Sequence, residues 1–232
     1  MQIGLLLFPA LTQLDLTGPY EVFARLPGAD VHLVWKTLEP VHCDRGMAIL
    51  PSTTFAEAPQ FDVICVPGGP GQIALMEDRE TLDFLRRQAG RAKWITSVCT
   101  GALVLGAAGL LEGYRATTHW ASHEQLAAFG AIPVRERWVI DRNRASGGGV
   151  TAGIDFALAL VARMAGETAA KAIQLGIEYD PAPPFQAGSP EGAGAEIVAQ
   201  LRSAMAAMLE KRRQATEAAA RNLAEMRRAE RR

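Results

Sequence analysis

One stretch decides the fold, and it is Lys93–Leu111, which reads KWITSVCTGALVLGAAGLL. Its first part, Trp94–Val98, is largely apolar without alternation, which is typical of a strand buried on both faces of a parallel sheet. Its second part, Ala102–Leu111, has a helical pattern. The chain therefore passes from strand to helix at Cys99, and small residues follow at once. Such a turn is typical of a nucleophile elbow, which projects one reactive side chain at the edge of a sheet.

The same alternation of apolar runs and helical patterns fills the first part of the chain. Strands are predicted at Gln2–Phe8, Val31–Trp35, Phe61–Val66, Arg115–Thr118, Arg137–Ile140 and Arg144–Ser146, with a small hairpin at Val41–Leu50. Helices are predicted at Leu14–Leu26, from an Asp78 cap to Gln88, at Ser122–Phe129 and at Val150–Met164. Interleaved strands and helices predict an α/β fold with a mostly parallel sheet between helical layers.

The C-terminal part has a different composition. Asp180–Ala193 (DPAPPFQAGSPEGA) is rich in Pro and Gly, and we expect no helix there. Ala195–Arg232 carries apolar residues at helical spacing and predicts one long amphipathic helix. From Leu209 onward it has eight basic and four acidic residues, a net charge of +4. We therefore divide the chain into an α/β domain, 1–180, and a loop with a C-terminal helix, 181–232.

The basic helix has three possible roles: packing on its own body or on a partner subunit, binding at a membrane surface, or contact with DNA. Because the segment is too short for a helix-turn-helix domain, we favour packing.

Composition excludes several classes of function. The chain has 232 residues, 24 Lys+Arg and 25 Asp+Glu, so its net charge of −1 argues against a nucleic-acid surface. No apolar run approaches the roughly 18 residues of a membrane span. Three cysteines without a CxxC pair suit neither a disulfide framework nor a zinc site. We expect a cytoplasmic protein with no metal, membrane or nucleic-acid partner.

The three cysteines lie in different settings. Cys99 begins a helix, where backbone N–H groups and the helix dipole are expected to lower its pKa. Cys65 lies inside the apolar run FDVICV, which predicts core packing. Cys43 lies in the polar hairpin and is interpreted as incidental. Cys99 is therefore the candidate nucleophile.

Other candidate residues follow neighbouring strands, and the carboxyl ends of parallel strands share one edge. Gly68 and Gly69 follow Phe61–Val66, and the Gly69 N–H is expected to face Cys99 as an oxyanion donor. Asp15 follows the first strand and either caps a helix or is a buried acid with a raised pKa. His119 follows another strand and competes with Asp15 as the partner of Cys99.

Together these residues resemble the ThiJ/PfpI superfamily, whose signature is a strand, a cysteine elbow and an acid after the first strand. Within it the chain looks most like the isocyanide hydratases, over roughly residues 1–180. The pieces that carry the resemblance are QLDLTGP (13–19), DVICVPGG (62–69), TSVCTGALVLGAAGLL (96–111), RATTHWASH (115–123), GGGVTAGIDFAL (147–158) and the PAPPFQAGSP loop (181–190).

The resemblance implies a flavodoxin-like three-layer sandwich that forms a homodimer. It implies that Cys99 is the nucleophile and Asp15 the acid/base, with backbone support from Gly69 and Thr100. Gly68 and His119 are left as pocket residues. The implied activity needs no cofactor: an isocyanide and water give an N-substituted formamide through a cysteine thioimidate. Thr100 stands where peptidase-like members have a histidine, which argues against a protease.

Three alternatives remain open on the sequence alone. The TSVCTGA…ATTHW pattern also resembles the sensor domains of AraC-type transcription regulators. A redox or stress sensor would oxidise Cys99 to a sulfinate. A glyoxalase or deglycase would use the same residues on an aldehyde.

Overall fold

The computed structural model describes residues 1–230, and a seven-stranded sheet forms its centre. The strands of this sheet are β1 (Gln2–Leu6), β2 (Asp30–Trp35), β5 (Thr53–Thr54), β6 (Val63–Val66), β7 (Trp94–Val98), β10 (Trp138–Asp141) and β11 (Arg144–Gly147). They lie in the order β10-β11-β7-β6-β1-β2-β5. Only the β10–β11 pair is antiparallel in this sheet, so the mostly parallel sheet is confirmed.

Helices and two small strand pairs complete the described chain. The helices are α1 (Gln13–Phe23), α2 (Gln72–Leu75), α3 (Arg79–Ala89), α4 (Gly101–Ala107), the 3-10 helix η1 (Trp120–Phe129), α5 (Ala152–Ala165), α6 (Glu167–Gly176), α7 (Pro190–Ala193), α8 (Ala195–Ala204) and α9 (Ala206–Glu230). The strand pairs are β3 (Val41–His42) with β4 (Ala48–Ile49), and β8 (Arg115–Ala116) with β9 (Ile132–Pro133).

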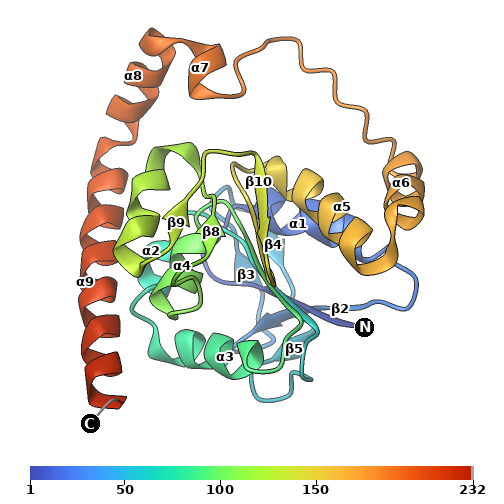
Figure 1. The fold of residues 1–232 in the computed structure, drawn as a ribbon, viewed down its shortest axis with the longest axis horizontal. Coiled ribbons are helices and arrows are strands. Elements are labelled where there is room, and N and C mark those ends of the chain that lie inside the picture. The colour runs from blue at the N-terminus through green and yellow to red at the C-terminus, as the bar shows by residue number, and fades with distance from the viewer. Residues whose placement is uncertain (231–232) are drawn as a thin grey trace.

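The helices cover both faces of the sheet (Figure 1). α1 packs against α5 on one side, and α5 contacts β11. α3 packs against α4 on the other side, and α4 contacts β6 and β7. This layered α/β arrangement is the predicted fold class.

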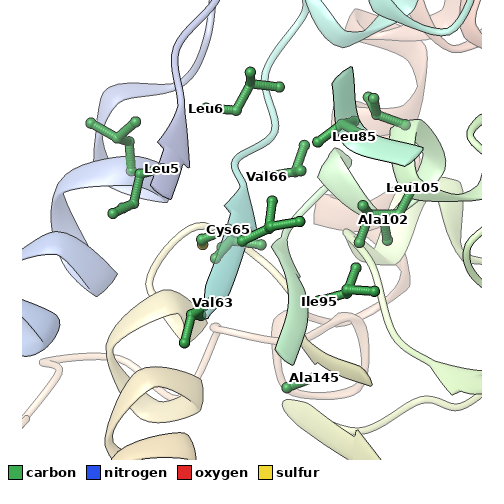
Figure 2. Close-up of a cluster of buried hydrophobic side chains, with 14 of the residues drawn as sticks. Leu5, Leu6, Val63, Cys65, Val66, Leu85, Ile95, Ala102, Leu105 and Ala145 are labelled. Carbon is green, nitrogen blue, oxygen red and sulfur yellow. The ribbon is translucent and has the colours of Figure 1, made fainter. Parts of the chain in front are cut away.

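The core forms where the predicted apolar strands meet these helices. All four residues of β6 are buried, and Cys65 in its middle is 0% exposed. Figure 2 shows Cys65 among Leu5, Val63, Ile95 and other apolar side chains. The prediction that Cys65 is a packing residue is therefore confirmed. Burial on both faces explains why these strands lack polar alternation.

Several local predictions need correction. The segment predicted as an ordinary helix at Ser122–Phe129 is the 3-10 helix η1. α4 ends at Ala107 rather than Leu111, and Gly109 follows in the left-handed region with φ +78. Pro190–Ala193 forms a helical turn, so the expectation of no helix in the Pro/Gly loop was wrong there. Ser189 Oγ caps this turn by accepting from the Gly192 N–H at 3.2 Å.

The C-terminal segment is two helices, α8 and α9, separated at Met205, instead of one. The last two predicted helical residues, 231 and 232, lie outside the described residues. α9 runs along the body and contacts α2, α4 and η1, burying Ala219 and Leu223 (Figure 1). Ile197 and Leu201 on α8 stay 45% and 46% exposed. No helix within residues 1–230 is long and apolar enough to cross a membrane.

Candidate active site

Cys99 lies at the junction of β7 and α4 with a φ of 54°. That left-handed conformation is uncommon for a non-glycine residue and costs free energy. Both backbone groups of Cys99 are held in place. Its N–H donates to the Gly147 carbonyl at 3.0 Å, and its carbonyl accepts from Thr118 Oγ1 at 2.7 Å. The sheet edge thus fixes the cysteine at a tight turn, as the elbow pattern predicts.

Gly101 gives this turn its room. A Cβ atom built on Gly101 would collide with the carbonyl oxygens of Val66 and Pro67. The loop after β6 therefore packs directly on the start of α4, and a side chain larger than hydrogen does not fit between them.

Asp15 lies in the first turn of α1 and is 0% exposed. The N-cap position of α1 is Thr12, and the Asp15 side chain turns inward instead. Its Oδ2 accepts from the Gly68 N–H at 2.9 Å. Its Oδ1 forms no hydrogen bond within the described residues, but the Cys99 side chain lies close enough to act on the pKa of the carboxyl. The structure therefore brings Asp15 and Cys99 together.

Burial raises the pKa of Asp15 from 3.8 to about 7. The hydrogen bonds from Cys99 and Gly68 oppose this rise, and the negative charge of Asp44 adds to it. Near neutral pH a large share of Asp15 is thus protonated, which makes it a proton donor beside the sulfur.

The expectation of a lowered pKa at Cys99 was wrong. Burial raises its pKa well above 9.0, and the charge of Asp15 raises it further. A backbone hydrogen bond from Thr100 and the positive charge of Arg212 act in the opposite direction. Because Asp15 and Cys99 compete for one proton, the thiolate forms most readily when Asp15 keeps that proton.

Neither of the two glycines after β6 acts as the oxyanion donor to Cys99 that was expected of the Gly69 N–H. The Gly69 N–H donates to Thr100 Oγ1 at 3.1 Å, so it holds the elbow and does not face the sulfur. A Cβ on Gly68 would lie 2.6 Å from the Thr100 nitrogen and 2.8 Å from Asp15 Oδ2. The close approach of the Gly68 backbone therefore sets the distance between the acid and the elbow.

His119 precedes η1 and does not take the role of partner to Cys99. Its Nδ1 accepts from the Ala121 N–H at 3.3 Å. Burial lowers its pKa to about 4, and the charge of Arg212 acts in the same direction. Because His119 stays neutral and caps η1, we interpret it as a residue of the pocket wall rather than as the base that deprotonates Cys99.

A cavity of about 1020 Å³ lies near the elbow, although neither Cys99 nor Asp15 is among its lining residues. Thr118, which binds the Cys99 carbonyl, and His119 are in its wall. Gly148 also lines the cavity, and it follows Gly147, whose carbonyl accepts from the Cys99 N–H. The loop Gly188–Glu191 and part of α9 form its other side. Gly68 is not in the wall, so its predicted place in the pocket is not seen.

Sequence reasoning missed two charged residues near the site. Asp44 follows Cys43, which is only 6% exposed rather than part of a polar surface. Asp44 Oδ2 accepts from Thr12 Oγ1 at 3.2 Å, and this places its charge beside Asp15. Arg212, on α9, is 3% exposed and acts on Cys99. Neither residue lies in a recognisable sequence motif. Asp44, in the hairpin, and Arg212, on α9, approach the site only through tertiary packing.

Comparison with known proteins identifies the family of the chain. The model of the DJ-1/PfpI family matches residues 1–163. The chain is 56% identical over 223 residues to the isonitrile hydratase of Pseudomonas putida, covering 96% of this chain and 98% of that protein. The crystal structure of a ThiJ/PfpI family protein from Pseudomonas syringae superposes with a TM-score of 0.90 and 47% identity, covering 94% of this chain and 90% of that one.

A more distant relative is named as a transcriptional regulator rather than as an enzyme. The HTH-type transcriptional regulator GbdR of Pseudomonas aeruginosa is 34% identical over 180 residues. The match covers 74% of this chain but only 48% of the regulator.

Proposed function

Since the chain belongs to the DJ-1/PfpI family, we propose that it is an isocyanide hydratase with a cysteine nucleophile. The observation that carries this proposal is the buried Asp15 carboxyl, which accepts from the Gly68 N–H at 2.9 Å and whose raised pKa responds to the Cys99 side chain. A terminal isocyanide carbon needs a nucleophile and a proton at the same atom, and this pair supplies both. The 56% identity to an isonitrile hydratase supports the same assignment.

In the first step the Cys99 thiolate attacks the terminal carbon of the isocyanide. Asp15 transfers its proton to that carbon, and a C–S bond and a C–H bond form. The product is a thioimidate, R–N=CH–S–Cys99, with Asp15 as a carboxylate. The Thr100 N–H supports the anionic sulfur before attack and again when it leaves.

In the second step the Asp15 carboxylate takes a proton from water, and the hydroxide adds to the thioimidate carbon. Asp15 passes that proton to the nitrogen and then takes the hydroxyl proton as the C–S bond breaks. The N-substituted formamide leaves, and Asp15 and Cys99 return to their starting states. One water is consumed for each isocyanide, and no cofactor takes part in these steps.

The cavity beside the elbow suits the nitrogen substituent of the substrate. Its wall combines Trp120 with the small residues Gly148 and Gly149. We propose that the isocyanide enters from this side, with its carbon directed at the sulfur.

Assembly and location are part of the same proposal. All three cysteines are free, which suits a reducing cytoplasm. Leu175 and Phe185 are 82% and 76% exposed on the segment that precedes α7, and such side chains suit a contact between two subunits. We propose that two copies of the chain form a homodimer. We also propose the division into an α/β domain, 1–180, and a loop with a C-terminal helix, 181–232.

The test is a substrate panel on the purified chain. Several isocyanides and, separately, methylglyoxal are incubated with enzyme, and formamide and lactate are quantified. The proposal expects formamide with each accepted isocyanide. Turnover of methylglyoxal alone would replace it with a glyoxalase, and oxidation of Cys99 by peroxide without turnover of either compound would favour a redox sensor.

A further inference from the structure

The side chain of Thr12 does not cap α1, although Thr12 is the N-cap residue of that helix. A threonine at this position commonly accepts a hydrogen bond from a backbone N–H of the first turn. Here the Asp15 N–H donates to the Thr12 carbonyl at 3.0 Å. The Thr12 hydroxyl donates instead to Asp44 Oδ2 at 3.2 Å, in the turn between β3 and β4. This hydroxyl therefore ties the start of α1 to the β3–β4 hairpin.

The backbone of Thr12 belongs to the support of the Asp15 carboxyl. The Thr12 N–H donates to the Gly68 carbonyl at 2.9 Å, and the Gly68 N–H donates to Asp15 Oδ2, also at 2.9 Å. Together with the bond from the Asp15 N–H to the Thr12 carbonyl, these contacts close a ring of three hydrogen bonds. Because the ring is closed, a displacement of Thr12 disturbs the bond that orients the carboxyl.

The β3–β4 hairpin clamps the loop that contains Thr12. The Ala10 N–H donates to the His42 carbonyl at 2.8 Å, and the Asp44 N–H donates to the Leu11 carbonyl at 2.9 Å. The bond from the Thr12 hydroxyl to Asp44 is the third contact of this clamp. Ala10 has a φ of 59°, in the left-handed region, and such a strained backbone persists where its surroundings hold it. The hairpin therefore keeps this loop in its place before α1.

The Asp44 carboxylate lies in a position that costs folding free energy. Its side chain is 15% exposed, and its Oδ1 is buried without a hydrogen bond in the described chain. Arg45 Nε lies 3.9 Å from Oδ2, but the arginine side chain is 90% exposed, where an ion pair contributes little. A carboxylate withdrawn from water and incompletely hydrogen-bonded is destabilising. Asp44 therefore calls for a role beyond stability, and its contact with Thr12 points to the support of Asp15.

We infer that Thr12 and Asp44 are positioning residues, which hold the Asp15 carboxyl against the Gly68 N–H. Asp44 acts through the Thr12 hydroxyl, and Thr12 acts through its backbone bonds to Gly68 and Asp15. The β3–β4 hairpin, which lies outside the central sheet, is then part of the support of the active site. The role of Asp15 as the acid comes from the proposed function, on which this inference rests.

The first test needs no isocyanide and follows the titration of Asp15 by NMR, in protein labelled at the carboxyl carbons of its aspartate side chains. The Asp15 resonance is the one that Asp15→Asn lacks, and its pKa is expected at about 7 in the wild type. Thr12→Val keeps the size of the side chain but removes the hydroxyl. The loosened carboxyl then gains access to water, and its pKa is expected to fall by about 1. Thr12→Ser should restore the wild-type pKa.

The variants of Thr12 leave the ionisable neighbours of Asp15 in place. These neighbours are Cys99, after β7, and Asp44, in the hairpin. The matched control is Thr17→Val, which removes a hydroxyl from the same helix, where it bonds Gln13. The pKa of Asp15 in this control is expected to equal that of the wild type.

Thermal melts show which variants are folded. If Thr12→Val is not, Asp44→Ala and Asp44→Asn carry the test, because both remove the charge but only the first removes the acceptor of the Thr12 hydroxyl. The pKa of Asp15 is then expected to be lower in Asp44→Ala than in Asp44→Asn. A wild-type pKa in folded Thr12→Val, or equal pKa values in the two folded Asp44 variants, would overturn the inference.

Steady-state kinetics test the consequence for the reaction. Where the wild type makes formamide, Thr12→Val should lose kcat roughly tenfold with little change in KM, because a displaced acid slows the chemical step more than it weakens binding. Thr12→Ser should regain most of that rate, and a wild-type kcat in folded Thr12→Val would also overturn the inference. A wild type that makes no formamide would end the hydratase proposal instead, while the NMR titration would still decide whether Thr12 and Asp44 hold Asp15.

Discussion

Asp15 Oδ2 accepts a hydrogen bond from the Gly68 N–H at 2.9 Å, although the two residues are 53 positions apart in the chain. This bond fixes one carboxyl oxygen and leaves the other without a hydrogen bond in the described chain, where the Cys99 side chain acts on its pKa. The acid is thereby oriented by the backbone of a neighbouring strand end.

The titration of Asp15 should appear in the pH dependence of stability. Between pH 3.8 and about 7 the unfolded chain ionises Asp15 while the folded protein keeps it protonated. The folded state then binds more protons, so its stability falls as pH rises through this window and is fullest below it. Relative to Asp15→Asn, the wild type should lose about 1.4 kcal/mol of unfolding free energy per pH unit there. Chemical denaturation at a series of pH values measures this, and parallel curves for the two proteins would contradict it.

Gly101→Ala should destabilise the protein. The added methyl group has no space between the start of α4 and the carbonyl oxygens of Val66 and Pro67. Overpacking against backbone costs about 3 kcal/mol, seen as a lower denaturation midpoint in urea. Gly176→Ala is the control, because nothing lies within 4 Å of the position at the end of α6. It should remain within about 1 kcal/mol of the wild type, and equal losses in both variants would refute the packing argument.

Thr118→Val should weaken the elbow. The variant leaves the Cys99 carbonyl without its 2.7 Å hydrogen bond in a buried position. The carbonyl then keeps only the longer 3.4 Å bond from the Ala102 N–H, so the variant should lose about 1 kcal/mol of stability. The rate of hydration should also fall, because the strained backbone of Cys99 loses the shorter of the two hydrogen bonds to its carbonyl. Thr17→Val removes a hydroxyl that bonds only Gln13 on the surface side of α1, and it should change neither stability nor rate. A Thr118→Val protein with both wild-type values would show that this anchor is dispensable.

His119→Asn should leave catalysis largely intact. With a pKa of about 4 the histidine stays neutral in the working range, and its ring serves as a helix cap. Asn also caps helices, so the variant should lose less than about tenfold in rate, below the hundredfold or more expected of a general acid or base. Steady-state kinetics across pH decide this. A large loss, or the disappearance of one limb of the pH profile, would make His119 part of the chemistry.

The body of the fold could be predicted from the sequence because its signals are local. β7 begins and ends where its apolar run does, and the Cys99 turn is marked by the small residues behind it. The type of η1 could not be predicted, because apolar spacing alone does not separate a 3-10 helix from an α-helix. The break at Met205 carries no proline or glycine and is equally invisible.

The site could be predicted only in part, for a physical reason. Asp15 and Cys99 follow strand ends, and parallel strand ends share an edge. The Gly69 N–H was misassigned because its acceptor is a side-chain hydroxyl on another loop. Arg212 lies among other basic residues of an amphipathic helix, where the sequence predicts a solvated face. Only tertiary packing reveals that it is buried and that its charge acts on the pKa of Cys99.

The central claim is that Cys99 forms a bond to the isocyanide carbon on the way to the formamide. The most direct measurement is the rate of formamide formation from a simple isocyanide by the wild type and by Cys99→Ala, with thermal melts to show that both are folded. The account predicts steady turnover by the wild type and none above background by Cys99→Ala. Formamide made at the wild-type rate by folded Cys99→Ala would contradict it.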